Sequence, residues 1–309
     1  MMTIPEYIPF VGGGLSETWP TTPRVSQRLL SLLLTLSLFT VAFAQAPPTI
    51  KITRVTNSAD FQPVLPQGGS LASVFLTGLQ GEPGVITATK YPLSNELNGI
   101  SAWIASRPAP ILAIGFLDGS QQINVQVPWE HTYNPLDPRS TVEVRQNGAL
   151  AQFQAVQATV PTSVFFADAD GYGVVQHASD YSLVTPQNPA RPGEYLIAYG
   201  INLGYIRNQP QTGEPAPFDP LATVYNPFII CKLDWSVQIG ATTATPSFMG
   251  LTPGTVGVSQ VNFQLPRSVP MGEQPLSFVW TSSGQAGGGG LFQCRYSVST
   301  SRSVKLPIR

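Results

Sequence analysis

The sequence predicts an all-β protein made of two related antiparallel β-sandwich modules. Three observations support this fold class. One pattern of segments occurs twice along the chain, short runs of alternating apolar and polar residues are separated by turn residues, and the composition combines few charges with many prolines and glycines. Such a sequence is typical of short strands joined by many turns rather than of long helices.

The composition indicates two domains and excludes two kinds of partner. A usual domain has ~100 to 150 residues, and this chain has 309. Its 42% apolar residues and net charge of −1 favour a folded core over disorder. The 16 Lys and Arg form no basic run, so the chain lacks the positive surface that binds nucleic acid or an anionic membrane.

Residues 1–44 are expected to form a signal peptide region. Residues 29–44 read LLSLLLTLSLFTVAFA, follow Arg24 and Arg28, and end in an A-x-A cleavage site. This run is shorter than the ~20 apolar residues of a membrane span, and an uncleaved anchor is the alternative. Residues 1–24 are too long and too uncharged for an n-region, so we expect translation to start at Val25. The mature chain is therefore expected in the periplasm, at the cell surface or outside the cell, without a membrane span.

An internal repeat organises the rest of the chain. The segment QINVQVP at residues 122–128 recurs as QVNFQLP at residues 260–266 with its polar and apolar residues in the same phase. Three further anchors agree in order, with offsets that grow as loop insertions between strands would make them grow. They pair residues 57–61 with 177–181, 69–79 with 193–203, and 97–101 with 233–237. We therefore place the first module at residues 49–160 and the second at residues 161–309.

Each copy consists of short predicted strands. In residues 122–127 the apolar residues fall on one face and the amides on the other, which is the period of a half-buried strand. Pro128 and Pro266 predict strand ends, because proline cannot donate a hydrogen bond to a central ladder. Similar runs lie at residues 73–76, 111–116, 141–144, 195–199, 235–239 and 276–280, with turn clusters such as QGEPG and TPG between them.

These motifs together resemble a known family. The order NSADF, GSLASVFLTGL, QINVQVPW, PARPGEY and VGVSQVNFQLP, within residues 49–280, resembles the Solibacter C-terminal domain family of large secreted acidobacterial proteins. That family is similar to IPT/TIG-type domains, so the resemblance implies two tandem immunoglobulin-like β-sandwich modules. It carries no established activity to transfer.

The residues that usually carry enzyme chemistry form no known motif. Neither His131 nor His177 lies at metal-ligand spacing from another His, a Cys or a carboxylate, and His177 is interpreted as a strand-end polar residue. The sequence around Ser70 lacks the second glycine of a nucleophile elbow, and residues 171–176 lack the third glycine of a dinucleotide-binding loop. We therefore expect a non-enzymatic protein without a cofactor.

Asp168 and Asp170 precede Gly171 as at the start of a calcium loop. Ser179 stands where the closing bidentate glutamate is required. A plain Asp-Gly turn is favoured, with weak surface calcium as the alternative.

The two amide rows and the adjacent tryptophan are the candidate ligand-facing residues. Amides offer paired donors and acceptors to sugar hydroxyls. The favoured alternative is structural, with side-chain bonds that tie a neighbouring loop or the other module. The candidates are Gln122, Asn124, Gln126, Gln260, Asn262, Gln264 and Trp129.

The leading hypothesis is a structural or interaction module of the cell envelope or secreted space, with an unknown protein or glycan as partner. The second is a carbohydrate-binding module, with Trp103, Trp129, Tyr133 and Tyr205 as possible stacking platforms. A hydrolase ranks third, because no acidic pair recurs between the copies.

A disulfide between Cys231 and Cys294 is expected. They are the only cysteines, and export delivers them to a compartment where disulfides persist. Two separate buried thiols are the alternative.

Overall fold

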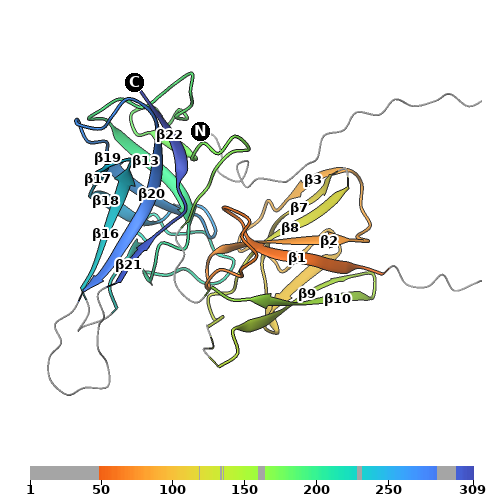
Figure 1. Ribbon diagram of the computed structural model, residues 1–309. Coiled ribbons are helices and arrows are strands. Elements are labelled where there is room, and N and C mark those ends of the chain that lie inside the picture. Colours follow the sequence, from red (N-terminus) through yellow and green to blue (C-terminus); the bar gives the residue numbers. More distant parts are fainter. Residues whose placement is uncertain are drawn as a thin grey trace, which may run out of the picture.

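The computed structural model describes residues 49–117, 119–132, 134, 136–158, 164–227, 232–283 and 297–309. Within these ranges the chain is all-β, and its strands form four antiparallel sheets consistent with β-sandwich domains (Figure 1). The described segments include no helix that is long and apolar enough to cross a membrane. The signal peptide region, Val25, the predicted module boundary and both cysteines lie outside the described residues.

The first half of the described chain, residues 49–158, forms two sheets. The order of the first is β1 (Lys51–Asn57), β2 (Leu71–Thr77), β8 (Ser120–Gln126), β7 (Ile111–Leu117) and β3 (Gly84–Thr87). The order of the second is β10 (Ala149–Val156), β9 (Arg139–Gln146), β5 (Ile100–Ile104) and β4 (Glu96–Leu97), with β6 (Arg107–Pro108) paired to β5.

The second half, residues 164–309, repeats this plan. Its first sheet has the order β11 (Val164–Phe165), β13 (Tyr195–Ile201), β19 (Ser259–Gln264), β18 (Pro246–Leu251), β15 (Thr223–Val224) and β14 (Ile206–Arg207), with β12 (Val175–His177) paired to β13. Its second sheet has the order β17 (Thr242–Ala244), β16 (Lys232–Ile239), β20 (Gly272–Ser283) and β21 (Ser297–Thr300), with β22 (Val304–Ile308) paired to β20.

Each half has its own apolar core, and the repeated strand supplies the centre of both. Ile123, Val125 and Val127 are fully buried in the first core. Their counterparts are fully buried in the second core, and they are Val261, Phe263 and Leu265. The predicted inward face of each repeated strand is therefore confirmed, as the two-residue period of a strand requires.

The two repeated strands occupy equivalent positions in their sheets. β8 lies between β2 and β7, and β19 lies between β13 and β18. Leu71 pairs with Gln126 as Tyr195 pairs with Gln264, so the register is the same. The neighbouring strands β7 and β18 also carry irregularities at matching places, between Ile111 and Ala113 and between Pro246 and Phe248. Pro128 and Pro266 follow the strand ends, as predicted.

The repeat anchor at residues 57–61 and 177–181 forms the same turn in both halves. The amide of Asn57 donates to the carbonyl of Gln62, and the amide of His177 donates to the carbonyl of Ser182. Phe61 and Tyr181, the last residues of the anchors, both have positive φ, at 55° and 60°. An aspartate one residue earlier accepts a backbone hydrogen bond in both turns.

The predicted alignment of residues 97–101 with residues 233–237, as equivalent positions of the two repeat copies, is wrong by one residue. Ile104 pairs with Arg107 across the β5–β6 turn, and Ile239 pairs with Thr242 across the β16–β17 turn. Ile104 therefore corresponds to Ile239, and Ala102 to Val237. Because side chains alternate between faces, a slip of one residue exchanges inward and outward positions. The short apolar anchor was too weak to define the register.

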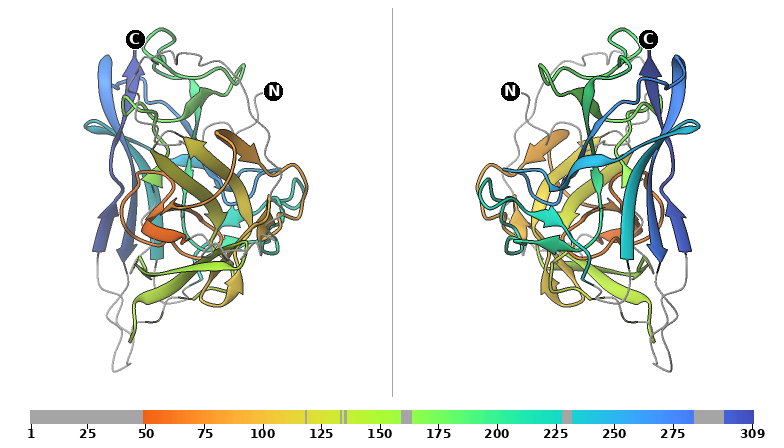
Figure 2. Two further views of the ribbon diagram at one scale, coloured as in Figure 1. Left: turned by 90° about the vertical axis from the view of Figure 1, so that its right-hand side faces the viewer. Right: turned by 90° about the vertical axis from the view of Figure 1, so that its left-hand side faces the viewer.

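A third apolar cluster joins the two halves, which lie side by side in Figure 1 and are seen from either side in Figure 2. The first half supplies Ala59 and Leu71, and its partly buried Leu112 packs against the cluster. The second half supplies the remaining buried members, which are Val164, Phe166, Val174, Ile197, Tyr199, Ile201 and Val258. The two halves therefore share an apolar contact.

Candidate functional site

The amide row of the first half is buried, and this corrects its assignment as a ligand-facing surface. Gln122, Asn124 and Gln126 are at most 2% exposed. The Asn124 Oδ1 atom accepts hydrogen bonds from Ser73 Oγ at 2.8 Å and from Gln122 Nε2 at 2.7 Å. The outer face of this strand is covered, so these amides serve the fold rather than a ligand in solvent.

Gln126 connects the two halves. Its Nε2 donates to the carbonyl of Gly69 in its own half at 3.3 Å, and its Oε1 accepts from the amide of Gly213 in the other half at 2.7 Å. Gly213 also accepts a 2.8 Å hydrogen bond from the amide of Leu93. Both backbone groups of Gly213 are thus bound to the first half.

The amide row of the second half repeats the internal bonds but remains more accessible. Gln260 and Asn262 are half-buried and Gln264 is exposed. Gln260 Nε2 donates to Asn262 Oδ1 at 3.2 Å, and Gln264 Nε2 donates to the carbonyl of Gly193 at 2.8 Å. The recurring bonds favour the structural interpretation of the Asn and Gln residues in both copies.

Trp129 lies at the junction of the halves. Its amide donates to Thr212 Oγ1 at 3.0 Å, and Thr212 Oγ1 donates to the Glu130 carboxylate at 2.8 Å. Its ring packs against a small apolar cluster of the second half that includes Ile206 and Leu251. The indole Nε1 is buried without a hydrogen-bond partner among the described residues.

A cavity of about 510 Å³, here called the junction cavity, opens beside Trp129. The first half contributes Trp129, His131 and Gln157 to its lining, and the second half contributes Tyr205 and Tyr225. Its volume lies within the ~300 to 1,000 Å³ that small-molecule sites occupy. The described lining residues include no Asp, Glu, Lys or Arg.

Two of the four aromatic residues named as stacking platforms meet at this cavity. Trp129 and Tyr205 both line it. Trp103 lies elsewhere, on β5, with the Arg145 guanidinium 4.6 Å from the centre of its ring. Tyr133 lies outside the described residues.

Three polar side chains of the first half, Gln157, Ser140 and His131, are connected by hydrogen bonds beside the junction cavity. Gln157 Nε2 donates to Ser140 Oγ, which lies 3.3 Å from His131 Nε2. Burial, with a smaller contribution from the Arg107 charge, lowers the pKa of His131 below its usual 6.5. A neutral ring can accept the Ser140 proton at Nε2. The other polar atom of the Gln157 amide, Oε1, is buried without a partner among the described residues.

Sequence reasoning missed Gln157, Tyr225 and Gly213 as residues of this region. Gln157 follows β10, Tyr225 follows β15, and Gly213 lies in the loop between β14 and β15. None belongs to a repeated motif or to a recognisable spacing. Gln157 and Tyr225 come from different halves and line the same cavity, and Gly213 bonds to Gln126 and Leu93 of the first half.

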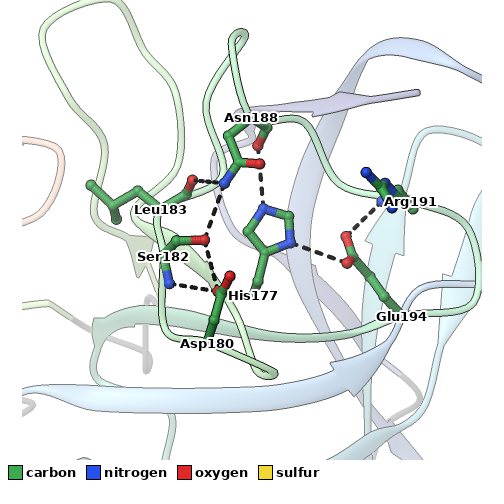
Figure 3. Close-up of polar contacts among 7 residues, drawn as sticks. All are labelled: His177, Asp180, Ser182, Leu183, Asn188, Arg191 and Glu194. Carbon is green, nitrogen blue, oxygen red and sulfur yellow. Dashed lines mark hydrogen bonds and ion pairs between the residues drawn. The ribbon is translucent and has the colours of Figure 1, made fainter.

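His177 belongs to a separate network that fastens a loop (Figure 3). Its Nδ1 lies 3.1 Å from Glu194 Oε2, and its Nε2 lies 3.2 Å from the carbonyl oxygen of Asn188. The Asn188 side chain donates in turn to Ser182 Oγ at 3.1 Å. Since both ring nitrogens have structural partners, the geometry fits a strand-end polar residue, as the sequence indicated.

Asp168 and Asp170 lie in the turn expected from Asp-Gly. Asp168 Oδ1 accepts hydrogen bonds from the amides of Asp170 at 3.0 Å and Tyr172 at 2.8 Å, and Gly171 has a φ of 85°. Across the described part of the chain, no three His, Cys, Asp or Glu side chains are grouped to hold a metal ion. The Asp168 carboxylate is engaged by the turn itself.

Comparison with known proteins does not identify this chain. No family model and no curated protein matches it. An endo-fucoidan hydrolase from glycoside hydrolase family 107 and a single-residue variant of it align with 85% of this chain, at 11% and 10% sequence identity respectively and a TM-score of 0.16 each. The chain spans 29% of the length of those structures. Such a score supports no inference about function.

Proposed function

We propose that this protein is an exported, non-enzymatic interaction module in which two immunoglobulin-like sandwiches act as one rigid body. Its place of action would be the periplasm, the cell surface or the extracellular space, and its partner an envelope protein or glycan. We also propose membership of the Solibacter C-terminal domain family, on the motifs quoted for it. The observation that carries the proposal is that Gly213 of the second half is hydrogen-bonded through both backbone groups to the first half, at Gln126 and Leu93. These bonds support the rigid body.

The close fit at the junction supports rigidity. Gly213 has a φ of 86°, and a Cβ atom there would lie 2.7 Å from the Leu93 carbonyl oxygen. At Gly257, with a φ of 71°, a Cβ atom would lie 2.5 Å from Leu71 Cδ2. Glycine adopts positive φ without a steric cost and permits such an approach. Two glycines of the second half therefore touch the first half where a side chain has no room.

The use of the recurring polar residues supports an architectural role. Both amide rows bond within the fold, and Gln126 adds the link to the other half. His177 holds a loop through both ring nitrogens.

Small-angle X-ray scattering of the mature chain tests rigidity. One relative orientation of the halves is expected to fit the wild type, and Gly213→Ala is expected to require several. Gly148→Ala is the matched control, because Gly148 has a similar φ of 80° but no atom within 4 Å of its Cβ position. A wild-type profile that requires many orientations would contradict the rigid body.

Cross-linking in intact producing cells tests the interaction role. The wild type is expected to trap an envelope protein or glycan, and Gly213→Ala is expected to trap less than Gly148→Ala. Turnover of a glycoside, ester or peptide by the purified chain, lost on a single substitution, would contradict the non-enzymatic assignment.

Carbohydrate recognition is a second candidate function. The observation in its favour is the meeting of Trp129 and Tyr205, from different halves, at the junction cavity. Aromatic rings are the usual platforms for the apolar faces of sugars because they combine a large apolar face with a polar edge.

A further inference from the structure

We propose that the junction cavity binds a neutral, polyhydroxylated ligand, namely one sugar unit of a larger glycan. The proposal rests on the carbohydrate-recognition candidate and gives it a site and a ligand class. Both halves build the cavity, so the site exists only when they are held in this arrangement.

Two residues that line the cavity, Gln157 and Trp129, each have a buried polar atom without a hydrogen-bond partner among the described residues, and they carry the proposal. Gln157 is 6% exposed, and its Oε1 has no hydrogen-bond partner among the described residues. Trp129 Nε1 is also buried without a hydrogen-bond partner among the described residues. Leaving such an atom unpaired destabilises the unliganded protein, so a ligand that pairs it is expected to bind about tenfold more tightly or better. A hydroxyl group can donate to the amide oxygen and accept from the indole N–H, and a sugar presents several hydroxyls on one ring.

The same class of ligand fits whichever way the Gln157 amide is turned. One of its two polar atoms bonds to Ser140, and the other is buried without a partner among the described residues. If the nitrogen were the unpaired atom, it would donate to a hydroxyl oxygen instead. A hydroxyl can both accept and donate a hydrogen bond, so it fits either orientation of the Gln157 amide. A carboxylate or an ammonium group would fit only one of these orientations.

The charge of the lining favours a neutral ligand. The described lining residues carry no acidic or basic side chain, and their polar groups are amides, hydroxyls and the His131 ring. Phosphate and carboxylate sites typically contain Arg or Lys to offset the ligand's charge. No described lining residue offers an ion such a partner, although the Arg207 guanidinium lies 5.3 Å from the ring centre of Tyr225.

Aromatic rings supply the apolar wall. Tyr205 is 47% exposed, and Tyr225 donates its backbone amide to the Tyr205 carbonyl at 2.9 Å, which keeps the two residues adjacent. Trp129 stands on the opposite half. Sugar rings have apolar C–H faces as well as hydroxyl edges, and this cavity combines aromatic and amide groups in the same way.

A microarray of neutral and acidic glycans, probed with the mature full chain, is the first experiment. The best neutral oligosaccharide on the array is then titrated by calorimetry against the wild type and three variants. Gln157→Leu is expected to weaken binding about tenfold or more, because it removes the unpaired polar atom. Tyr205→Ala, on the exposed rim, is expected to weaken binding without loss of folding. Trp103→Ala, on a different sheet, is the control and should bind as the wild type does.

The outcomes separate the site from the function. If the wild type binds a neutral glycan and both Gln157→Leu and Tyr205→Ala bind it equally well, the junction cavity is not the site, although carbohydrate recognition stands. If the wild type binds no glycan, the proposal is overturned together with the carbohydrate candidate. If it binds acidic glycans alone, the neutral-ligand proposal is overturned and carbohydrate recognition stands. Should Gln157→Leu fail to fold, Tyr205→Ala decides the question.

Discussion

The backbone amide of Gly213 donates a 2.7 Å hydrogen bond to Gln126 Oε1, across 87 residues of sequence. Gln126 is the last residue of the amide row Gln122, Asn124 and Gln126 on β8, and Gly213 lies in a loop of the second half. Gln126 therefore links the two halves, whereas its counterpart Gln264 bonds within its own half. This asymmetry provides a matched pair of substitutions.

Gln126→Leu is expected to destabilise the protein by about 2 to 4 kcal/mol, because it leaves the Gly213 amide and the Gly69 carbonyl without their side-chain partner. Gln264→Leu, the same change at the equivalent exposed position, is expected to cost about 0.5 kcal/mol or less. Urea unfolding followed by tryptophan fluorescence measures both values. Equal losses in the two variants would show that the junction bond contributes nothing specific.

Val125→Asp is expected to destabilise the first half by more than about 4 kcal/mol, because it places an unpaired charge in a fully buried position. Gln154→Asp is the control, since Gln154 is exposed on β10 of the same half. Thermal unfolding of the two purified variants measures the difference. A melting temperature of Val125→Asp close to that of the control would contradict the assigned inward face.

Protonation of His131 is expected to destabilise the fold under mildly acidic conditions. Burial and the Arg107 charge hold the pKa of His131 below 6.5 in the folded protein, so the unfolded chain binds this proton more readily. The stability contribution is therefore present above pH 6.5 and is lost as the pH falls through the folded pKa. His131→Gln should lose this part of the pH dependence.

NMR titration of the imidazole signals gives a direct check of that pKa. Arg107→Gln removes the smaller of the two causes and should move the pKa of His131 upward, toward 6.5, without reaching it. A midpoint for His131 at or above 6.5 in the wild type would contradict the prediction.

Tyr199 is expected to make the junction sensitive to alkali. Burial, with a smaller contribution from Tyr181, raises its pKa from 10.0 to about 12. The folded state thus retains a proton that the unfolded chain releases, so the stability contribution is present below pH 10.0 and is lost as the pH rises through about 12. Tyr199→Phe should show a smaller loss of unfolding free energy over this range. Ultraviolet titration should show one fewer late-titrating tyrosine in the variant than in the wild type.

A Cys231–Cys294 disulfide stays a prediction, since both residues lie outside the described part of the chain. Closing a loop of roughly sixty residues would stabilise the second half by ~4 kcal/mol at most. Non-reducing peptide mapping of the exported protein should recover the two cysteines in one linked peptide pair. Recovery of both as free thiols would favour the alternative of separate buried thiols.

Several features of the fold could be predicted from local pattern alone. The two-residue period in residues 122–127 and 260–265 predicted which side chains face each core, because every second side chain of a strand points the same way. The repeated turns at Asn57 and His177 were also recognisable, since their hydrogen bonds join residues that are close in sequence. The weak anchor at residues 97–101 failed, because a few apolar residues do not define a register.

Only the tertiary structure decided the roles of the amides and the location of the candidate site. Gln126 and Gln264 stand in the same motif and register, yet one is buried at the junction and the other is exposed. The difference comes from the loop that carries Gly213, which packs against the first half and has no counterpart bond described at Gln264. Contacts between distant segments depend on how two folded surfaces fit together, and local periodicity carries no information about that fit.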